Sequence, residues 1–162
     1  MPAAGDPMGN TTTTHTHTPR ASAQTAASLE ACNGGAIEGC HAAALDAYYS
    51  PPSADTNSRA LALFRKACDE GYAPSCNGLG VLYQEGRGVS QDPGIAALLF
   101  RRACATDGST GCQHLAQALR TGRGVTKDLQ GADRAEARGK CLFEASLAKD
   151  DRACPPLEAE TR

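Results

Sequence analysis

Cysteine spacing is the feature that most restricts how this chain can fold. Six of the eight cysteines form three pairs whose members are eight residues apart, and each pair repeats after 36 residues. The pairs are Cys32 and Cys40, Cys68 and Cys76, and Cys104 and Cys112. A fixed period of this length is typical of a solenoid, in which similar units stack one on another. We therefore expect about three stacked repeats of 36 residues.

Other residues repeat with the same period and describe two helices in each unit. Gly86 and Gly122 suit the end of one helix, whereas Asp92 and Asp128 suit the N-cap of the next. Apolar residues between these positions recur with helical spacing. Predicted helices cover residues near 38–49, 57–70, 93–106, 110–121 and 129–147, and a further one follows the turn at 69–74 and ends before Gly86. The fold class expected is thus all-α, an α/α solenoid.

Each cysteine pair falls where one predicted helix ends and the next begins. Residues eight apart in one continuous helix would be about 12 Å apart, whereas a disulfide needs Cα atoms within roughly 4.4 to 6.8 Å. The predicted hairpins meet that need, so we expect disulfides, with reduced core cysteines as the alternative. Zinc ligands usually lie two to four residues apart, and no C-x-x-C occurs, so no metal site is expected. Cys141 and Cys154 are 13 apart and leave their pairing open.

Length and charge restrict the remaining possibilities. A chain of 162 residues suits one domain, and a net charge of −2 gives no electrostatic reason to expect a nucleic-acid partner. No apolar stretch is long enough for a transmembrane segment. We divide the chain into a disordered Thr/His/Pro-rich tail at 1–20, a repeat domain at 21–154 and a C-terminal tail at 155–162. The first tail has no secretory signal pattern, although disulfides would place the protein in an oxidising compartment. Three explanations remain open: a signal upstream of this start, another import route, or thiols that stay reduced.

The repeated residues resemble a known family. They are Leu79-Gly80, Tyr83, Gly86-x-Gly88-Val89, Asp92, Ala96, Phe100 and Ala103-Cys104. This pattern resembles the Sel1-like repeat, a relative of the tetratricopeptide repeat, over about residues 28–154. The cysteine pairs are similar to those of the disulfide-bridged Helicobacter cysteine-rich protein family. The resemblance implies a right-handed superhelix of antiparallel helix pairs that binds peptides or proteins, in an exported bacterial branch often labelled penicillin-binding or β-lactamase-like.

One motif could carry enzymatic chemistry. Ser146 and Lys149 fit the S-x-x-K pattern of serine β-lactamases and penicillin-binding proteins, but no S-D-N or K-T-G accompanies them. A single short match of this kind often arises by chance. We therefore expect no catalytic residue, and Ser146 and Lys149 are the candidates if there is one.

Basic residues recur at the solenoid period and form two predicted rows. The rows comprise Arg65, Lys66, Arg101 and Arg102, and then Arg87 and Arg123. They could hold carboxylates of a partner, or, as we favour for the first four, complement helix dipoles near helix C-termini. Polar residues of the helices that follow each cysteine pair are further contact candidates: Asn77, Gln84, Glu85, Gln113 and Gln117. We expect His41 and His114 to be surface or packing residues.

The function expected from the sequence is a monomeric scaffold or adaptor that binds a protein or peptide, without cofactor. A penicillin-binding or β-lactamase-like activity is the first alternative, and a redox or assembly factor is the second. The cysteines and the family resemblance favour a periplasmic or extracellular location. The mitochondrial intermembrane space is the alternative, because a similar cysteine-bearing Sel1 protein serves there.

Overall fold

A computed structural model describes residues 20–106, 108–150 and 153–157. The tail expected at 1–20 lies outside these residues except for Arg20. The described part contains seven helices and no strand, which confirms the all-α prediction. The helices are α1 (Arg20–Asn33), α2 (Ile37–Tyr49), α3 (Ala54–Asp69), α4 (Ala73–Glu85), α5 (Pro93–Ala105), α6 (Ser109–Thr121) and α7 (Leu129–Ala148).

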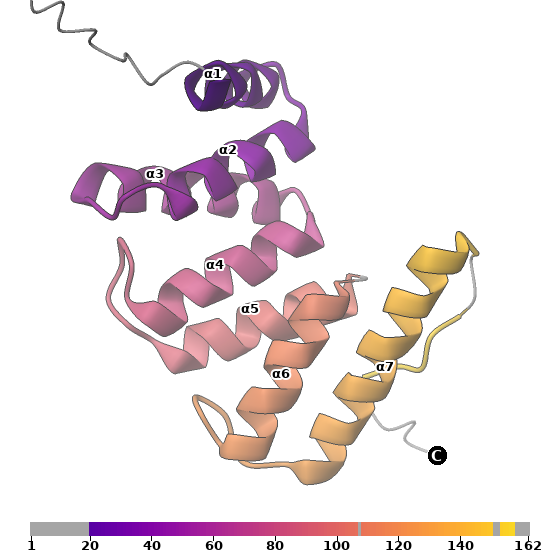
Figure 1. Cartoon of the computed structure of the whole chain (residues 1–162). Helices are drawn as coiled ribbons and strands as arrows, with labels where there is room; N and C mark the ends of the chain where they lie inside the picture. The colour runs from indigo at the N-terminus through magenta and orange to yellow at the C-terminus, as the bar shows by residue number, and fades with distance from the viewer. Residues whose placement is uncertain (1–19, 107, 151–152, 158–162) are drawn as a thin grey trace, which may run out of the picture.

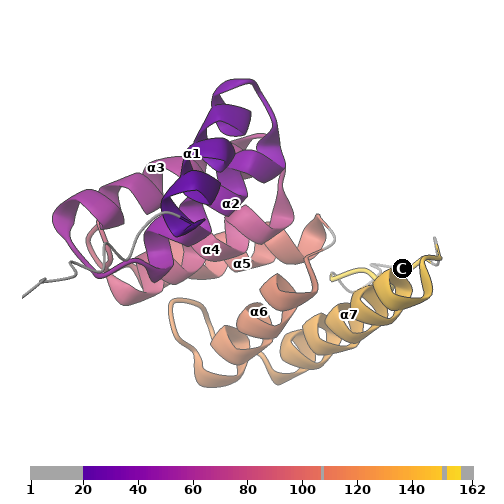
Figure 2. The same cartoon turned by 45° about the horizontal axis from the view of Figure 1, so that its top comes forward.

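The helices stack in chain order, as a solenoid requires. Each helix packs mainly on the next one along the chain, and α4 and α5 reach past their neighbours to α6 and α7 respectively. Figure 1 shows α1 to α5 as a stack, with α6 and α7 standing more steeply beside it. The C-terminal half of α7 projects away from α4 and α5 in both Figure 1 and Figure 2. Among the described residues, no helix combines the length and the apolar content needed to cross a bilayer.

Capping residues explain where the helices begin and end. Asp92 Oδ1 accepts a hydrogen bond from the Ile95 amide, and Gly86 adopts the left-handed conformation with φ of 72° at the end of α4. Asp128 and Gly122 repeat these two roles 36 residues later. The predicted boundaries at these four residues are confirmed. Each cap stabilises its helix because it satisfies backbone groups that the helix end leaves unpaired.

One predicted boundary is wrong. The helix expected from residue 57 begins at Ala54, because Ser53 and Thr56 form a capping box: the Ser53 hydroxyl accepts from the Thr56 amide, and Thr56 Oγ1 accepts from the Ser53 amide. The Ser-Pro-Pro-Ser segment therefore starts this helix earlier than the aspartate caps of the later repeats do. The 36-residue period therefore predicts a later start than the capping box gives.

Three disulfides connect successive helices, and a fourth connects α7 to the C-terminal segment. Cys32–Cys40, Cys68–Cys76 and Cys104–Cys112 join the end of one helix to the start of the next, with Cα separations of 4.4, 4.5 and 4.5 Å. All six of these cysteines are buried, with at most 2% of their surface exposed. Cys141 of α7 pairs with Cys154, at a Cα separation of 5.7 Å, and both residues are only half-buried. The predicted disulfide pairs are thus confirmed, and the open pairing is settled.

Glycines on α4 let two phenylalanines fill a core that has few large side chains. Phe64 and Phe100 are 1% and 2% exposed and lie on α3 and α5, on either side of α4. A Cβ at Gly78 would lie 2.7 Å from the Phe64 ring, and one at Gly80 would lie 2.6 Å from the Phe100 ring. These contacts are shorter than normal packing allows, so the glycines are required for the rings to pack this closely.

Candidate functional site

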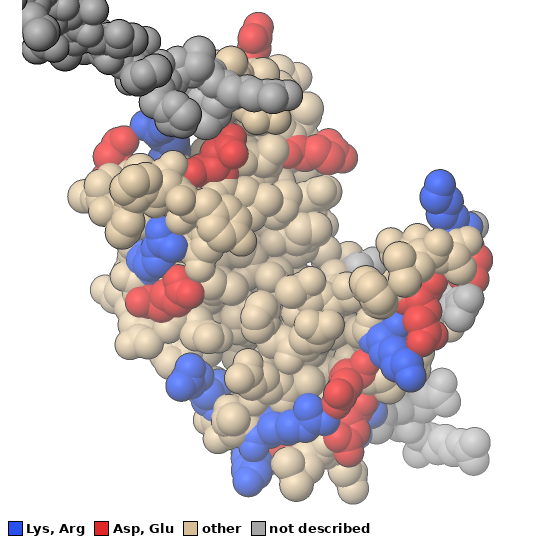
Figure 3. Space-filling view, viewed as in Figure 1, with Lys and Arg blue, Asp and Glu red and all other residues tan. Residues whose placement is uncertain are grey.

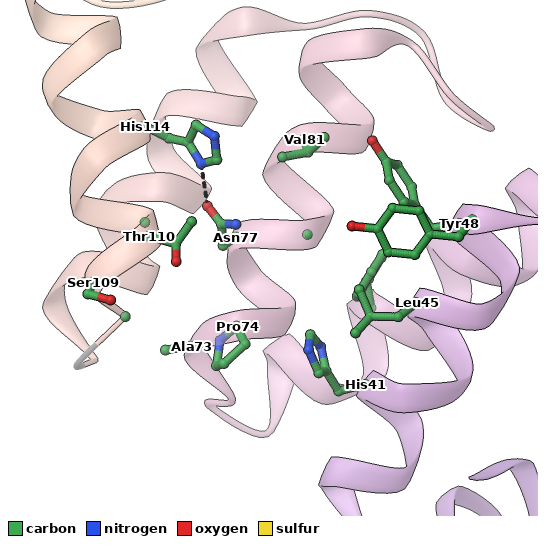
Figure 4. A pocket seen from close by; sticks show the side chains of 15 residues that line it. His41, Leu45, Tyr48, Ala73, Pro74, Asn77, Val81, Ser109, Thr110 and His114 are labelled. Atoms are coloured by element: carbon green, nitrogen blue, oxygen red, sulfur yellow. Dashed lines mark hydrogen bonds between the residues drawn. The ribbon is translucent and has the colours of Figure 1, made fainter. Parts of the chain in front are cut away.

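A groove crosses three alternate helices, α2, α4 and α6. Its volume is about 480 Å³, which is within the range of ligand-binding clefts. We call it the α2/α4/α6 groove, and Figure 4 shows His41, Tyr48, Asn77 and His114 around it. None of its lining residues is Asp, Glu, Lys or Arg. The groove therefore combines apolar surface with neutral hydrogen-bonding groups.

His41 connects α2 to the start of α4. Its Nδ1 lies 2.9 Å from the hydroxyl oxygen of Ser75, which is fully buried. The imidazole ring also packs on Phe64 and Tyr72, with centroid distances of 5.8 and 5.2 Å. Because burial disfavours the charged ring, the pKa of His41 is lowered. His41 is thus a packing residue, which is one of the two roles expected from the sequence. It also lines the groove.

His114 makes the corresponding connection from the other side, between α6 and α4. Its Nδ1 lies 2.7 Å from Asn77 Oδ1, and its ring packs at 4.7 Å from the Phe100 ring. An amide oxygen only accepts hydrogen bonds, so His114 Nδ1 carries the proton. Burial again lowers the pKa of this histidine. Asn77 is the one predicted contact candidate that lines this groove, and its amide orientation is set by His114.

Two tyrosines form the end of the groove at α2. The Tyr48 hydroxyl donates to the Glu85 carboxylate at 3.2 Å, and the Arg87 guanidinium lies 4.2 Å above the Tyr48 ring. Burial, with the carboxylate of Glu85 acting in the same direction, raises the pKa of Tyr48. Tyr49 packs edge-on against Tyr48 and remains 78% exposed. Tyr48 is therefore fixed, whereas Tyr49 offers an exposed aromatic surface.

Arg87 holds helices together and does not line the groove. Its Nη2 donates to the Tyr48 carbonyl at 2.9 Å and to Asn57 Oδ1 at 3.2 Å, so it joins the loop after α4 to α2 and α3. The side chain of Glu85 lies 4.0 Å from the same guanidinium. Arg123, one period later, is exposed and lines a smaller hollow of about 110 Å³ together with Gln84 and Gln117.

The second basic residue of each predicted pair connects neighbouring repeats. Lys66 Nζ donates to the Cys32 carbonyl at 3.1 Å, and Arg102 Nη2 donates to the Asp69 carbonyl at 3.3 Å. Arg138 Nε, one period further, donates to the Cys104 carbonyl at 2.9 Å. Each cation thus donates to a carbonyl at the C-terminal end of a helix in the preceding repeat. The helix-dipole interpretation differs, because in it these residues complement the helices at whose C-termini they lie and stay solvated. The period identifies Arg138, which the predicted set omits.

The other predicted contact residues lie outside the groove. Arg65 is exposed and donates to the Tyr83 hydroxyl at 3.2 Å. Arg101 lines a separate hollow beside Leu157, and Gln113 is exposed on α6. Ser146 and Lys149 lie exposed at the C-terminal end of α7, where Lys149 is the left-handed C-cap. Neither of these two lines the groove.

Comparisons with known proteins agree with the stacked helix pairs. The family model described as Sel1 repeat matches residues 42–72, 73–105 and 109–132. A search of curated proteins finds no match. The structure is similar to that of Helicobacter pylori cysteine rich protein B, with a TM-score of 0.62 and 21% identity over 80% of this chain and 92% of that one.

Two further solved structures share the architecture. A protective antigen of uropathogenic Escherichia coli, c5321, which displays an SLR fold, has a TM-score of 0.65 and 21% identity over 77% of this chain, which spans 28% of the antigen. A Sel1 repeat protein from Oxalobacter formigenes has a TM-score of 0.59 and 18% identity, with 84% and 95% of the two chains covered. At such identities the likeness concerns the fold. Because the family model covers more than half of its residues, the chain belongs to the Sel1 repeat family.

Proposed function

We propose that this protein is a scaffold that binds a segment of another protein, or a peptide, in the α2/α4/α6 groove. The observation that carries the proposal is the groove itself: a hollow of about 480 Å³ that spans three successive repeats and combines apolar surface with neutral polar groups. Sel1 repeats belong to a class of helical solenoids whose extended surfaces typically serve protein interaction. The exposed ring of Tyr49 adds the kind of aromatic anchor that interfaces use.

Amide chemical-shift mapping tests this proposal. The full chain, labelled with ¹⁵N, would be titrated with pools of short synthetic peptides whose ends are acetylated and amidated. We expect shifts concentrated on residues of α2, α4 and the start of α6, because these residues line the groove. Shifts confined to α7 and the C-terminal segment would reject the groove as the binding surface. The variant Tyr49→Ser, which removes the exposed ring, should weaken groove binding without a change in fold.

An oxidising compartment outside the cytoplasm fits this scaffold. Four disulfides hold all eight cysteines, and three of them recur once per repeat. Structural disulfides persist where thiols are not kept reduced. Alkylation of intact source cells with a thiol reagent, followed by mass spectrometry, should find no modified cysteine in this protein. Extensive alkylation of the native protein would argue for a reducing compartment instead.

A further inference from the structure

We infer that the α2/α4/α6 groove takes an extended, uncharged segment of a partner polypeptide, and that Asn77 binds a main-chain carbonyl of that segment. The inference deepens the proposed function and rests on it, because it specifies which polypeptides the same groove accepts. Three features of the groove carry it: the absence of charge among the lining residues, the donor that His114 holds in place on Asn77, and the apolar surface beside that donor.

Charge is the first feature. The lining includes no Asp, Glu, Lys or Arg, and burial keeps His41 and His114 neutral by lowering the pKa of each. Two of the periodic basic residues, Lys66 and Arg102, donate to carbonyls of neighbouring repeats, and none of the periodic basic residues lines the groove. Figure 3 shows charged side chains toward the margins of the face it presents, with uncharged surface between them. A charged side chain buried in such a groove would lose its hydration without a partner, so uncharged segments are favoured.

The fixed donor is the second feature. Asn77 Oδ1 accepts from His114 Nδ1, which orients the amide and leaves Nδ2 with hydrogens to donate. In Figure 4 this nitrogen is turned away from His114, toward the side of the groove where Leu45 and Tyr48 lie. A donor already held in one orientation loses little freedom on binding. A main-chain carbonyl is the acceptor that every extended peptide supplies, whatever its side chains, so Asn77 binds the backbone and His114 acts as its positioning residue.

The apolar surface is the third feature. Leu45, Tyr48 and Val81 line the groove beside Asn77, and the Phe64 ring contributes to its lining. Gly78 keeps the Phe64 ring close to the surface of α4, since any larger residue would collide with that ring. An aliphatic or aromatic side chain next to the bound carbonyl would bury its surface here. The segment is therefore expected to carry at least one large apolar residue.

Two matched peptide pools test the charge requirement. One pool of short peptides, acetylated and amidated, contains only apolar and neutral polar residues, and the second is identical except that neutral polar positions carry Asp, Glu, Lys or Arg. We expect the uncharged pool to bind at least about tenfold more tightly, with amide shifts at Asn77 and His114. Equal or tighter groove binding of the charged pool would overturn the inference while leaving the proposed function intact. The absence of groove shifts with either pool would remove both.

Substitutions test the role of Asn77. Asn77→Ala should weaken the best uncharged peptide about fivefold, the effect of one lost hydrogen bond, and Asn77→Asp should weaken it further because a carboxylate repels a carbonyl. Gln113→Ala is the matched control, since Gln113 is exposed on α6 and lies outside the groove lining. Melting temperatures establish that each variant is folded. Unchanged affinity of Asn77→Ala would overturn the role assigned to this residue.

A change in the peptide gives the same information without altering the protein. Replacing single amide bonds of the best peptide by esters weakens each carbonyl as an acceptor in turn. One ester should reduce the affinity of the unsubstituted protein and have no effect on the affinity of Asn77→Ala, because the bond it weakens is already absent there. If every ester lowers the affinity for the unsubstituted protein and for Asn77→Ala by the same factor, Asn77 binds no main-chain carbonyl and the inference is wrong.

Discussion

Single residues at the groove couple stability to pH. Burial lowers the pKa of His41 and of His114 in the folded protein, whereas in the unfolded chain both titrate near the ordinary value of about 6.5. As the pH falls below that value the unfolded state binds more protons, so the free energy of unfolding decreases down to the pKa of the folded state. Urea unfolding between about pH 7 and pH 5 should show this loss. The double variant His41→Gln, His114→Gln should have a shallower slope, and an unchanged slope would assign the loss to other groups.

A glycine on α4 should be as sensitive to substitution as a large core residue. Gly78→Ala places a Cβ 2.7 Å from the Phe64 ring, which is fully packed and has little room to move. We expect a loss of roughly 1 to 3 kcal/mol in the free energy of unfolding. Gly34→Ala is the control, because a Cβ there meets nothing closer than 3.5 Å. Urea unfolding that gives equal values for the two variants would contradict the packing argument.

The elements of this fold follow from the sequence wherever they repeat. Asp92 and Gly86, with their counterparts one period later, bound helices at the predicted positions, because caps act locally and the period reveals them. The predicted start of α3 is wrong because the capping box at Ser53 does not recur at Asp92 or Asp128, the N-caps of α5 and α7. The sequence predicts no helix at residues 20–33, where the structure has α1, since this segment has few large apolar residues. Periodicity thus predicts the common framework and misses what is particular to one repeat.

The groove could not be predicted in the same way, because its key residues do not repeat. The positions one period before and after Asn77 hold His41 and Gln113, and the position one period before His114 holds Gly78. The hydrogen bond from His114 to Asn77 joins residues 37 apart, on two different helices. The packing of α4 against α6 brings them together. Of the repeated arginines, Arg87 and Arg102 donate to carbonyls of other helices, and neither lines the groove.

At the level of helices, the inter-repeat cations should contribute measurably to stability. Arg138 donates to the Cys104 carbonyl at 2.9 Å and to the Pro155 carbonyl at 3.0 Å, and so joins α5, α7 and the C-terminal segment. Arg138→Ala should lower the free energy of unfolding by about 1 to 3 kcal/mol, since it leaves carbonyls at a helix end without a charged donor. Arg123→Ala, at an exposed position, should change it by less than about 0.5 kcal/mol. Equal effects in urea unfolding would count against an inter-repeat role for Arg138.

The whole molecule depends on local connections, because a stack of helix pairs has few contacts between distant parts. Each helix packs mainly on its sequence neighbours, and each of three hairpins is closed by a buried disulfide. The large side chains that could compensate are scarce, with 3 Phe, 4 Tyr and no Trp. The disulfides restrict the unfolded chain and so supply stability that a core rich in alanine lacks. They also differ in accessibility, which decides how the molecule responds to a reductant.

That difference predicts the order in which the disulfides open. Cys141 and Cys154 are half-buried, whereas the other six cysteines are at most 2% exposed. Thiolate attack requires access to a sulfur atom, so mild dithiothreitol should reduce Cys141–Cys154 first. Loss of this disulfide releases the link between α7 and residues 153–157, where Leu157 packs on the core formed by α5, α6 and α7. Closing a loop of this size stabilises a fold by about 3 kcal/mol in the chain-entropy model, so the melting temperature should fall at this first step.

Timed alkylation followed by mass spectrometry measures the order. The first two thiols to appear should be those of Cys141 and Cys154, and the double variant Cys141→Ser, Cys154→Ser should release none under the same mild conditions. Because this disulfide lies at α7 and the groove at α2, α4 and α6, its reduction should leave peptide binding in the groove unchanged. The sulfurs of Cys68–Cys76 become accessible only when the hairpin of α3 and α4 separates. If this disulfide were reduced before Cys141–Cys154, the repeats would open more readily than the burial of their cysteines indicates.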